Sequence, residues 1–308
     1  MSAANKSGMD LRTFKDADGV DISYRTWLSE GTLRGIVLIA HGASEHSGRY
    51  DRFAGFLNGR GYAVYGIDHR GHGATSAATG VGIGGPRGWD GMVDDLRELG
   101  ALARAEAGGG PLVLFGHSMG SFLSQLFAQR HGSEIDGLVL SGSSGGIAAL
   151  DDTIAMLQAV SADGAGGEPA PIFGPLNAPF EPGRTPFDWL SRDEAEVDKY
   201  LADPWCGDRA PLTIDFVLDM MKHGRDTWDP DAEKRIPASL PVLFITGEAD
   251  PVSEGGATVR ELEARYRANG ITDVTGLYYP DARHELLNET NRDAVSDDVA
   301  DWLDRVIA

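Results

Sequence analysis

Three residues that lie far apart in the sequence have the types and the order needed to cleave an ester or amide bond. The pentapeptide GHSMG at residues 116–120 matches G-x-S-x-G, a pattern that places a serine on a sharp strand-to-helix turn. In hydrolases built this way, an acid and then a histidine follow the serine along the chain. Asp250 closes an apolar run, and His284 is the only histidine after it. We therefore predict Ser118 as the nucleophile, His284 as the general base and Asp250 as the acid that orients the histidine.

A second match to the serine pattern, GSSGG at residues 142–146, makes Ser144 an alternative nucleophile. Two glycines follow Ser144, which delays any helix, whereas a plausible helix follows Ser118 at once. This context favours Ser118 and predicts that Ser144 lies in a loop. The alternative acids are Asp281, Asp273 and Glu248.

The decapeptide HGASEHSGRY at residues 41–50 follows an apolar run and has the features of an oxyanion-binding loop. A glycine at position 42 lets the backbone turn tightly and direct an amide inward. We expect the amides of Ala43 and Met119 to bind the oxyanion of the tetrahedral intermediate, where one such donor contributes about 3–4 kcal/mol. We expect His41 to order this loop through hydrogen bonds.

These candidate residues fit a mostly parallel sheet, because short apolar runs alternate with amphipathic stretches along the chain. An Asp18-Gly19 turn predicts an entry hairpin over Phe14–Trp27. Six further strands are predicted at Gly35–Ala40, Tyr62–Asp68, Pro111–Gly116, Gly137–Ser141, Pro241–Thr246 and Thr275–Tyr279. Helices are predicted at Arg49–Arg60, Trp89–Ala107, Ser121–His131, Ser253–Asn269 and Asn291–Ile307. The predicted fold class is α/β.

The alternation of strands and helices stops after Ser143. The next predicted strand begins only at Pro241, and a strand-to-strand crossover needs only about a dozen residues, so we infer a long insertion. We predict a cap subdomain over residues 145–236 and a core made of residues 1–144 and 237–308. Apolar residues recur in the cap at helical spacing, at Ile147, Leu150, Ile154 and Leu157. This stripe either grips an acyl chain or packs on the core.

The overall composition excludes several classes of partner. The chain has 308 residues and a formal net charge of -20, which argues against nucleic acid and against docking on anionic lipid. We therefore expect at most peripheral membrane contact through the cap. No cofactor motif is present, and the single cysteine, Cys206, allows neither an intrachain disulfide nor a cysteine metal cluster. Residues 1–12 lack the apolar core of a signal peptide, so we expect a cytoplasmic protein of undetermined oligomeric state.

Several motifs together resemble one family. The HGASEHSGRY loop, DHRGHG at residues 68–73 and GHSMG are similar to the monoacylglycerol lipase branch of the α/β-hydrolases. That branch includes bacterial lysophospholipases and is grouped with serine aminopeptidases. In the cap, LSRD at 190–193, EVDKY at 196–200 and the Asp-Pro pair at 203–204 also resemble this family. The resemblance implies an α/β-hydrolase fold with an inserted cap.

The resemblance also implies substrate-binding residues. The glutamate and arginine that lie near the polar leaving group in this family match Glu45 and Arg49, and a cap tyrosine matches Tyr200. We expect His117, beside the nucleophile, to line the same site. The alternative is that Glu45 and Arg49 pair with each other and hold the loop.

The expected function is that of a serine carboxylester hydrolase, a monoacylglycerol lipase or lysophospholipase that acts on a small ester or monoacyl lipid. Two enzymatic alternatives remain: a general carboxylesterase, and an aminopeptidase-like hydrolase in which Glu194 or Glu196 binds a substrate amine. A non-enzymatic alternative is a ligand-binding protein of the hydrolase fold.

Overall fold

A single mixed sheet forms the centre of the protein. The computed structural model describes residues 9–29 and 31–307. Within these ranges eight strands form the sheet: β1 (Met9–Lys15), β2 (Asp21–Trp27), β3 (Gly35–Ala40), β4 (Tyr62–Ile67), β5 (Leu112–His117), β6 (Gly137–Ser141), β7 (Val242–Gly247) and β8 (Val274–Tyr279). Their order is β1-β2-β4-β3-β5-β6-β7-β8. The predicted hairpin is β1 with β2, β2 also pairs antiparallel with β4, and every later pair is parallel.

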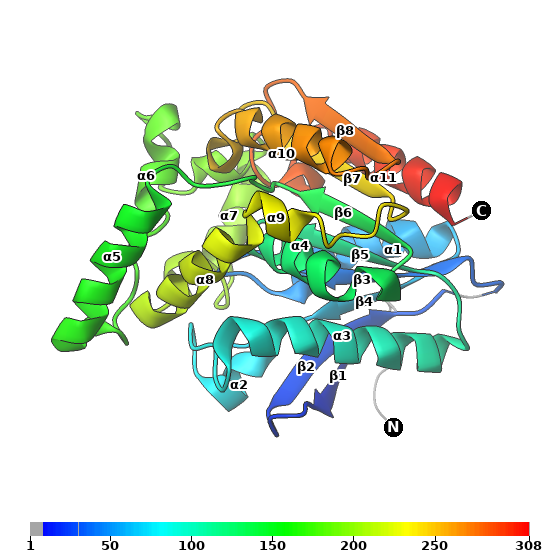
Figure 1. Cartoon of the computed structure of the whole chain (residues 1–308), viewed down its shortest axis with the longest axis horizontal. Coiled ribbons are helices and arrows are strands. Elements are labelled where there is room, and N and C mark those ends of the chain that lie inside the picture. Colours follow the sequence, from blue (N-terminus) through cyan, green and yellow to red (C-terminus); the bar gives the residue numbers. More distant parts are fainter. Residues whose placement is uncertain (1–8, 30, 308) are drawn as a thin grey trace.

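Helices cover both faces of the sheet (Figure 1). One face carries α1 (Asp51–Gly59) and α11 (Arg292–Val306), and the other carries α3 (Gly88–Ala107), α4 (Met119–His131) and α10 (Ala257–Ala268). Successive strand residues point to opposite faces, so strands β3 to β7 are buried on both sides and consist of unbroken apolar runs. This arrangement confirms the predicted α/β class.

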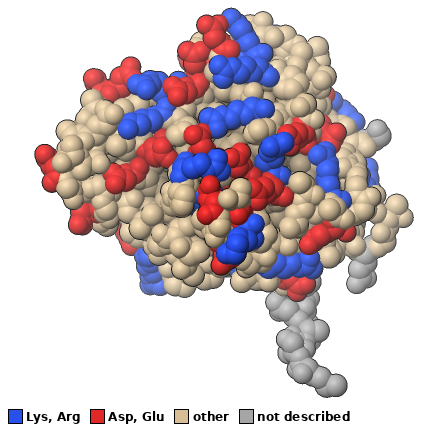
Figure 2. Space-filling model, turned by 60° about the horizontal axis from the view of Figure 1, so that its bottom comes forward, with Lys and Arg blue, Asp and Glu red and all other residues tan. Residues whose placement is uncertain are grey.

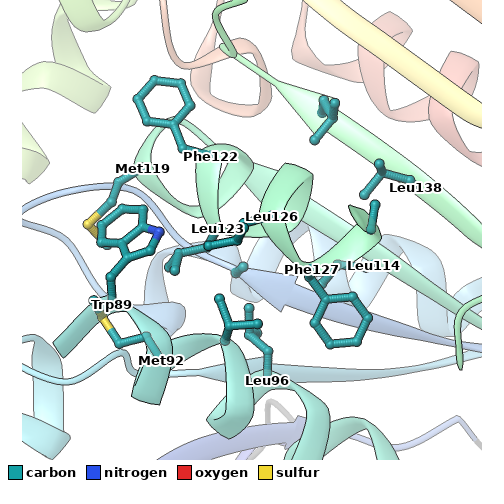
Figure 3. Packing of buried hydrophobic residues seen from close by; sticks show 14 of the residues in the cluster. Trp89, Met92, Leu96, Leu114, Met119, Phe122, Leu123, Leu126, Phe127 and Leu138 are labelled. Carbon is teal, nitrogen blue, oxygen red and sulfur yellow. The ribbon is translucent and has the colours of Figure 1, made fainter. Parts of the chain in front are cut away.

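The layer between α3, α4 and the sheet is filled by large apolar side chains. Figure 3 shows Met119 and Phe122 of α4 close to Trp89 of α3, with Leu126 and Leu114 farther along the same layer. This packing fixes the beginning of α4, the helix that follows the candidate nucleophile.

Some predicted helix boundaries are wrong for local backbone reasons. The helix predicted from Ser253 begins only at Ala257, because Glu254, Gly255 and Gly256 all have positive φ angles and therefore cannot extend a right-handed helix. The helix predicted from Arg49 begins at Asp51, after a short 3₁₀ turn.

Residues 145–236, which we call the insertion, lie between β6 and β7. The insertion contains α5 (Leu150–Val160), α6 (Gly174–Asn177), α7 (Glu194–Ala202), α8 (Ile214–Thr227) and α9 (Pro230–Glu233). Helices α5 and α8 pack on each other on the left in Figure 1, and α6 and α7 contribute to a separate apolar cluster. Ile154 and Leu157 of the predicted apolar stripe are buried, and Ile147 and Leu150 pack beside them, so this stripe is internal packing.

Many basic side chains on the surface form ion pairs with acidic ones, although acidic residues outnumber them and leave a net charge of -20. On the face that Figure 2 presents, acidic and basic side chains lie next to one another. Pairs along α3, such as Arg97 with Glu134 and Arg104 with Asp136, are examples of this arrangement. No helix in the described part of the chain has the length and apolar character needed to cross a bilayer.

Candidate active site

Ser118 lies at a strained turn between β5 and α4. Its backbone has φ 51° and ψ -122°, a conformation that L-residues seldom adopt. The two motif glycines permit this turn because the chain passes very close to them. A Cβ atom on Gly120 would overlap the carbonyl oxygens of Ala40 and His41, and one on Gly116 would overlap the backbone of α4. The G-x-S-x-G spacing is therefore a steric requirement of this turn.

The predicted acid and base are hydrogen-bonded to each other. Asp250 follows β7, and its Oδ2 lies 2.9 Å from Nδ1 of His284. The other carboxylate oxygen accepts the amide of Val252 at 2.9 Å, which fixes the carboxylate. Both side chains are buried. Because the acid holds the proton on Nδ1, the Nε2 atom of His284 carries the lone pair that a general base needs.

The electrostatic surroundings of His284 favour its charged form. Burial, the largest single influence, would lower the pKa of this imidazole, but the Asp250 carboxylate, Glu285 and Glu45 together outweigh it. The net effect is a pKa raised above the ordinary value of 6.5. The carboxylate that is predicted to orient His284 thus also favours the protonated form of its ring.

Ser118 and His284 line one cavity, together with Ala43. Among the described residues the Ser118 hydroxyl has no hydrogen-bond partner, and contacts of this kind often tighten only when substrate is bound. The alternative nucleophile, Ser144, is buried elsewhere and bonds Thr258 at 3.0 Å. Of the alternative acids, Asp281 is exposed, while Asp273 pairs with Arg305 and Glu248 with Arg260.

Ala43 and Met119 present the two amides expected to bind an oxyanion. Met119 is the first residue of α4, so its amide has no acceptor within the helix. No hydrogen bond from the Ala43 amide is found in the described part of the chain, and this residue lines the cavity. The neighbouring amide of Gly42 donates to Oε1 of Glu45 at 2.6 Å, which holds the loop.

Glu45 and Arg49 pair with each other, and a second carboxylate joins them. Arg49 donates from Nη1 to Glu45 at 2.6 Å, and from both terminal nitrogens to Glu285 at 2.6 and 2.7 Å. Tyr50 donates its hydroxyl to Glu45 at 2.9 Å. Burial would raise the pKa of Glu45, but the Arg49 guanidinium and other nearby groups lower it to about 2. The pairing of Glu45 with Arg49, which was the alternative to substrate binding, is therefore present in this structure.

Tyr200 and His117 complete the polar wall of the site. The ring of Tyr200 lies under the Arg49 guanidinium at 4.8 Å, and its hydroxyl donates to the carbonyl of Ser44 at 3.1 Å. The His117 ring is 4.8 Å from that of His284 and lines the cavity. Burial and the neighbouring His284 lower the pKa of His117 to about 4, so this ring is neutral at pH 7.

The insertion closes the cavity over these residues. Its side chains in the lining are Phe173, Trp189, Leu190 and Tyr200, and the volume left is about 20 Å³. A volume of this size holds about one water molecule. Glu194 and Glu196, the candidates for binding an amine, do not line this cavity. Glu196 instead bonds Arg52 and Lys199.

Two residues of the site were not predicted. Glu285 directly follows His284, so its position beside the base offered a sequence signal. Trp189 directly precedes the LSRD motif, and nothing in the sequence marks it as a neighbour of the active site.

One cluster combines three metal-ligating residue types: His46, Asp203 and Cys206. Its hydrogen bonds argue against a metal site. Nδ1 of His46 accepts the amide of Gly48 at 3.2 Å, so the neutral ring carries its proton on Nε2, 3.0 Å from Asp203. Burial raises the pKa of the Cys206 thiol, which keeps it protonated.

Comparisons with known proteins identify the family to which the chain belongs. The family described as "Serine aminopeptidase, S33" matches residues 31–291. A monoacylglycerol lipase of Mycolicibacterium smegmatis is 29% identical, with 94% of this chain and 95% of that protein covered. The human monoglyceride lipase is 27% identical, with 92% and 89% covered.

A solved structure is similar over nearly the whole chain. It is a thermostable carboxyl esterase from Bacillus coagulans in complex with glycerol, with 27% identity and a TM-score of 0.90, and the match covers 98% of this chain and 99% of that one. The eight-stranded sheet with flanking helices is the α/β-hydrolase fold. The chain belongs to the serine aminopeptidase S33 family of α/β-hydrolases, and it is a serine hydrolase related to the monoglyceride lipases and esterases.

Proposed function

We propose that the protein hydrolyses the ester bond of monoacylated lipids, above all monoacylglycerols, through an acyl-enzyme on Ser118. The observation that carries this proposal is the hydrogen bond that joins Asp250 to His284, which lines the same cavity as Ser118. Similarity to monoacylglycerol lipases along nearly the full length of the chain supports the choice of substrate class.

The reaction proceeds in two steps. In the first, Nε2 of His284 removes the hydroxyl proton of Ser118, and the oxygen attacks the ester carbonyl. The amides of Ala43 and Met119 stabilise the negative charge that develops on the carbonyl oxygen. The imidazolium of His284 then protonates the departing alkoxide, which leaves as an alcohol. In the second step, water replaces the alcohol and the same transfers release the fatty acid.

The charge around the leaving group favours a neutral alcohol. Two carboxylates, Glu45 and Glu285, face one guanidinium, that of Arg49, whose terminal nitrogens are already bonded to them. An anionic phosphate placed here would be repelled by this excess negative charge, whereas glycerol hydroxyls can donate hydrogen bonds to the carboxylates. We therefore place monoacylglycerol ahead of lysophospholipid as the substrate.

The insertion acts in this proposal as a cap subdomain, residues 145–236, over a core of residues 1–144 and 237–308. A cavity of about 20 Å³ cannot hold an acyl chain, so substrate binding requires part of the cap to move. Phe173 is the half-buried member of the cap lining, and the segment that carries it is the proposed point of opening.

A panel of purified substrates tests the proposal. We expect hydrolysis of monoacylglycerols to exceed that of lysophospholipids and of aminoacyl amides, and Ser118→Ala to abolish all three activities. A preference for aminoacyl amides would favour the aminopeptidase alternative. Hydrolysis of short soluble esters alone would favour a general carboxylesterase, and no hydrolysis by the wild type would favour a ligand-binding protein.

A further inference from the structure

Trp189 of the insertion lies directly against the imidazole of His284. The ring centroids are 4.9 Å apart with an interplanar angle of 41°. The carbonyl oxygen of Trp189 also accepts the amide of His284 at 3.4 Å. Only 3% of Trp189 is exposed, so its indole shields the base from water. A residue that the cap contributes therefore contacts the base both through its ring and through its backbone.

The chain segment around Trp189 is firmly tied to the loop that carries His284. The amide of Glu285 donates to the carbonyl of Leu190 at 2.7 Å, and Arg283 donates to the carbonyl oxygen of Asp188. Buried Glu289 accepts hydrogen bonds from the amide of Arg192, from the Arg192 side chain and from the amide of Arg283. We call residues 188–192 the strap. These bonds hold the indole in place, independently of the segment that carries Phe173.

An aromatic ring 4.9 Å from the base, tilted by 41° to the imidazole, has a specific electrostatic consequence. His284 becomes a cation when it takes the serine proton, and the face of an indole attracts a cation whose centre lies within about 6 Å. Such contacts are worth a factor of about 2 to 30 in an equilibrium constant. The other groups that face His284 are Asp250, which bonds Nδ1, the carboxylates Glu285 and Glu45, and the neutral ring of His117.

We propose that Trp189 is a positioning residue for the general base, which holds His284 in the orientation set by Asp250 and stabilises its imidazolium. This inference rests on the proposed function of Ser118 and His284. It adds that His284 has its full support as the base only while the strap is bonded to the loop that carries this histidine. The family motif in the cap begins at Leu190, one residue after Trp189, so this role lies outside the residues that carry the resemblance.

Two substitutions separate the aromatic contribution from simple packing. Trp189→Phe keeps an aromatic face but removes the indole N–H, while Trp189→Leu fills a similar space without a ring. Phe173→Leu is the matched control, because Phe173 stacks on Trp189 at 6.1 Å and lines the cavity, but no aromatic contact joins it to His284 among the described residues.

The readouts are kcat and the pH dependence of kcat/KM for a p-nitrophenyl ester. We expect Trp189→Leu to lower kcat by about 2- to 30-fold relative to Trp189→Phe. Its acid limb should lie at lower pH, because the imidazolium has lost the aromatic face and the pKa of His284 falls. Phe173→Leu should change KM without moving the acid limb. Equal kcat values and equal acid limbs for the two Trp189 variants would overturn the proposal.

Thermal unfolding shows whether each variant folds. If Trp189→Leu does not fold, an NMR titration of His284 in the wild type and in Trp189→Phe decides, because an indole binds a cation better than a benzene ring does. A pKa of His284 that is lower in Trp189→Phe supports the proposal, and an unchanged pKa overturns it. A wild type that cleaves nitrophenyl esters but not monoacylglycerols would contradict the lipid substrate and leave this test intact.

Discussion

Nδ1 of His41 donates a hydrogen bond to the carbonyl oxygen of Gly42 at 2.7 Å. The direction of this bond follows from the other side of the ring, because Nε2 accepts the amide of His69 at 3.0 Å and so carries no proton. The carbonyl of Gly42 and the amide of Ala43 belong to one planar peptide. The bond from His41 therefore fixes the direction in which the Ala43 amide points.

Replacing His41 with alanine tests this relationship. The Gly42-Ala43 peptide would be free to turn, and the oxyanion would lose an oriented donor, so we expect kcat to fall by up to about 100-fold with little change in KM. Steady-state kinetics with a nitrophenyl ester measure both constants. His223→Ala, which alters a histidine on α8, is the control, and an equal loss in that variant would refute a specific role for His41.

Replacing Asp250 with asparagine tests the acid. An amide at this position can donate to Nδ1 of His284 and favour the wrong tautomer, so we expect kcat to fall by about 10⁴-fold with the fold intact. Asp281→Asn is the matched control, since Asp281 is a nearby exposed carboxylate and should leave kcat unchanged. A larger loss in the Asp281 variant would assign the acid role to that residue.

The pH dependence of kcat/KM follows from the raised pKa of His284. Only the neutral imidazole accepts the serine proton, so activity is lost as pH falls through this pKa, which lies above 6.5. Glu285→Gln removes a negative charge that favours the imidazolium, and the acid limb should then move to lower pH. Rate profiles between pH 5 and 9 measure the acid limb of the wild type and of the variant. A shift of this limb to higher pH in the variant would contradict this account.

The buried pairing of Arg49 predicts a large effect on stability. Arg49→Leu would leave the Glu45 and Glu285 carboxylates without their partner, and we expect the free energy of unfolding to fall by about 3–5 kcal/mol. Urea denaturation measures this change. Arg97→Leu, which breaks an exposed pair with Glu134, should cost no more than about 1 kcal/mol. Similar losses of unfolding free energy in the two variants would show that the buried pairing of Arg49 contributes no more to stability than the exposed pair.

Much of the fold and of the site could be predicted because the signals are local. The parallel strands are unbroken apolar runs, and the serine turn needs glycine at both flanking positions for steric reasons. The chain order of acid and histidine then singled out Asp250 and His284. The strands and the serine turn depend on a few neighbouring residues. The acid and the histidine follow from the order in which hydrolases of this fold carry them.

Trp189 could not be predicted, because its role depends on how the insertion folds back over the core. Its contact with His284 spans almost a hundred residues of sequence and arises from the bonds that tie the strap to Arg283 and Glu289. The first residue of α10 was predicted wrongly for a different reason. Glu254 adopts a left-handed conformation, which glutamate seldom does and which its residue type therefore does not predict.

Covalent labelling of the nucleophile tests the central claim most directly. The purified protein is incubated with a fluorophosphonate, and intact mass and peptide mapping locate the adduct. We predict a single adduct on Ser118, complete loss of ester hydrolysis with the same time course, and no labelling of Ser118→Ala. An adduct on Ser144 or on any other residue, or wild-type hydrolysis by Ser118→Ala, would contradict the account.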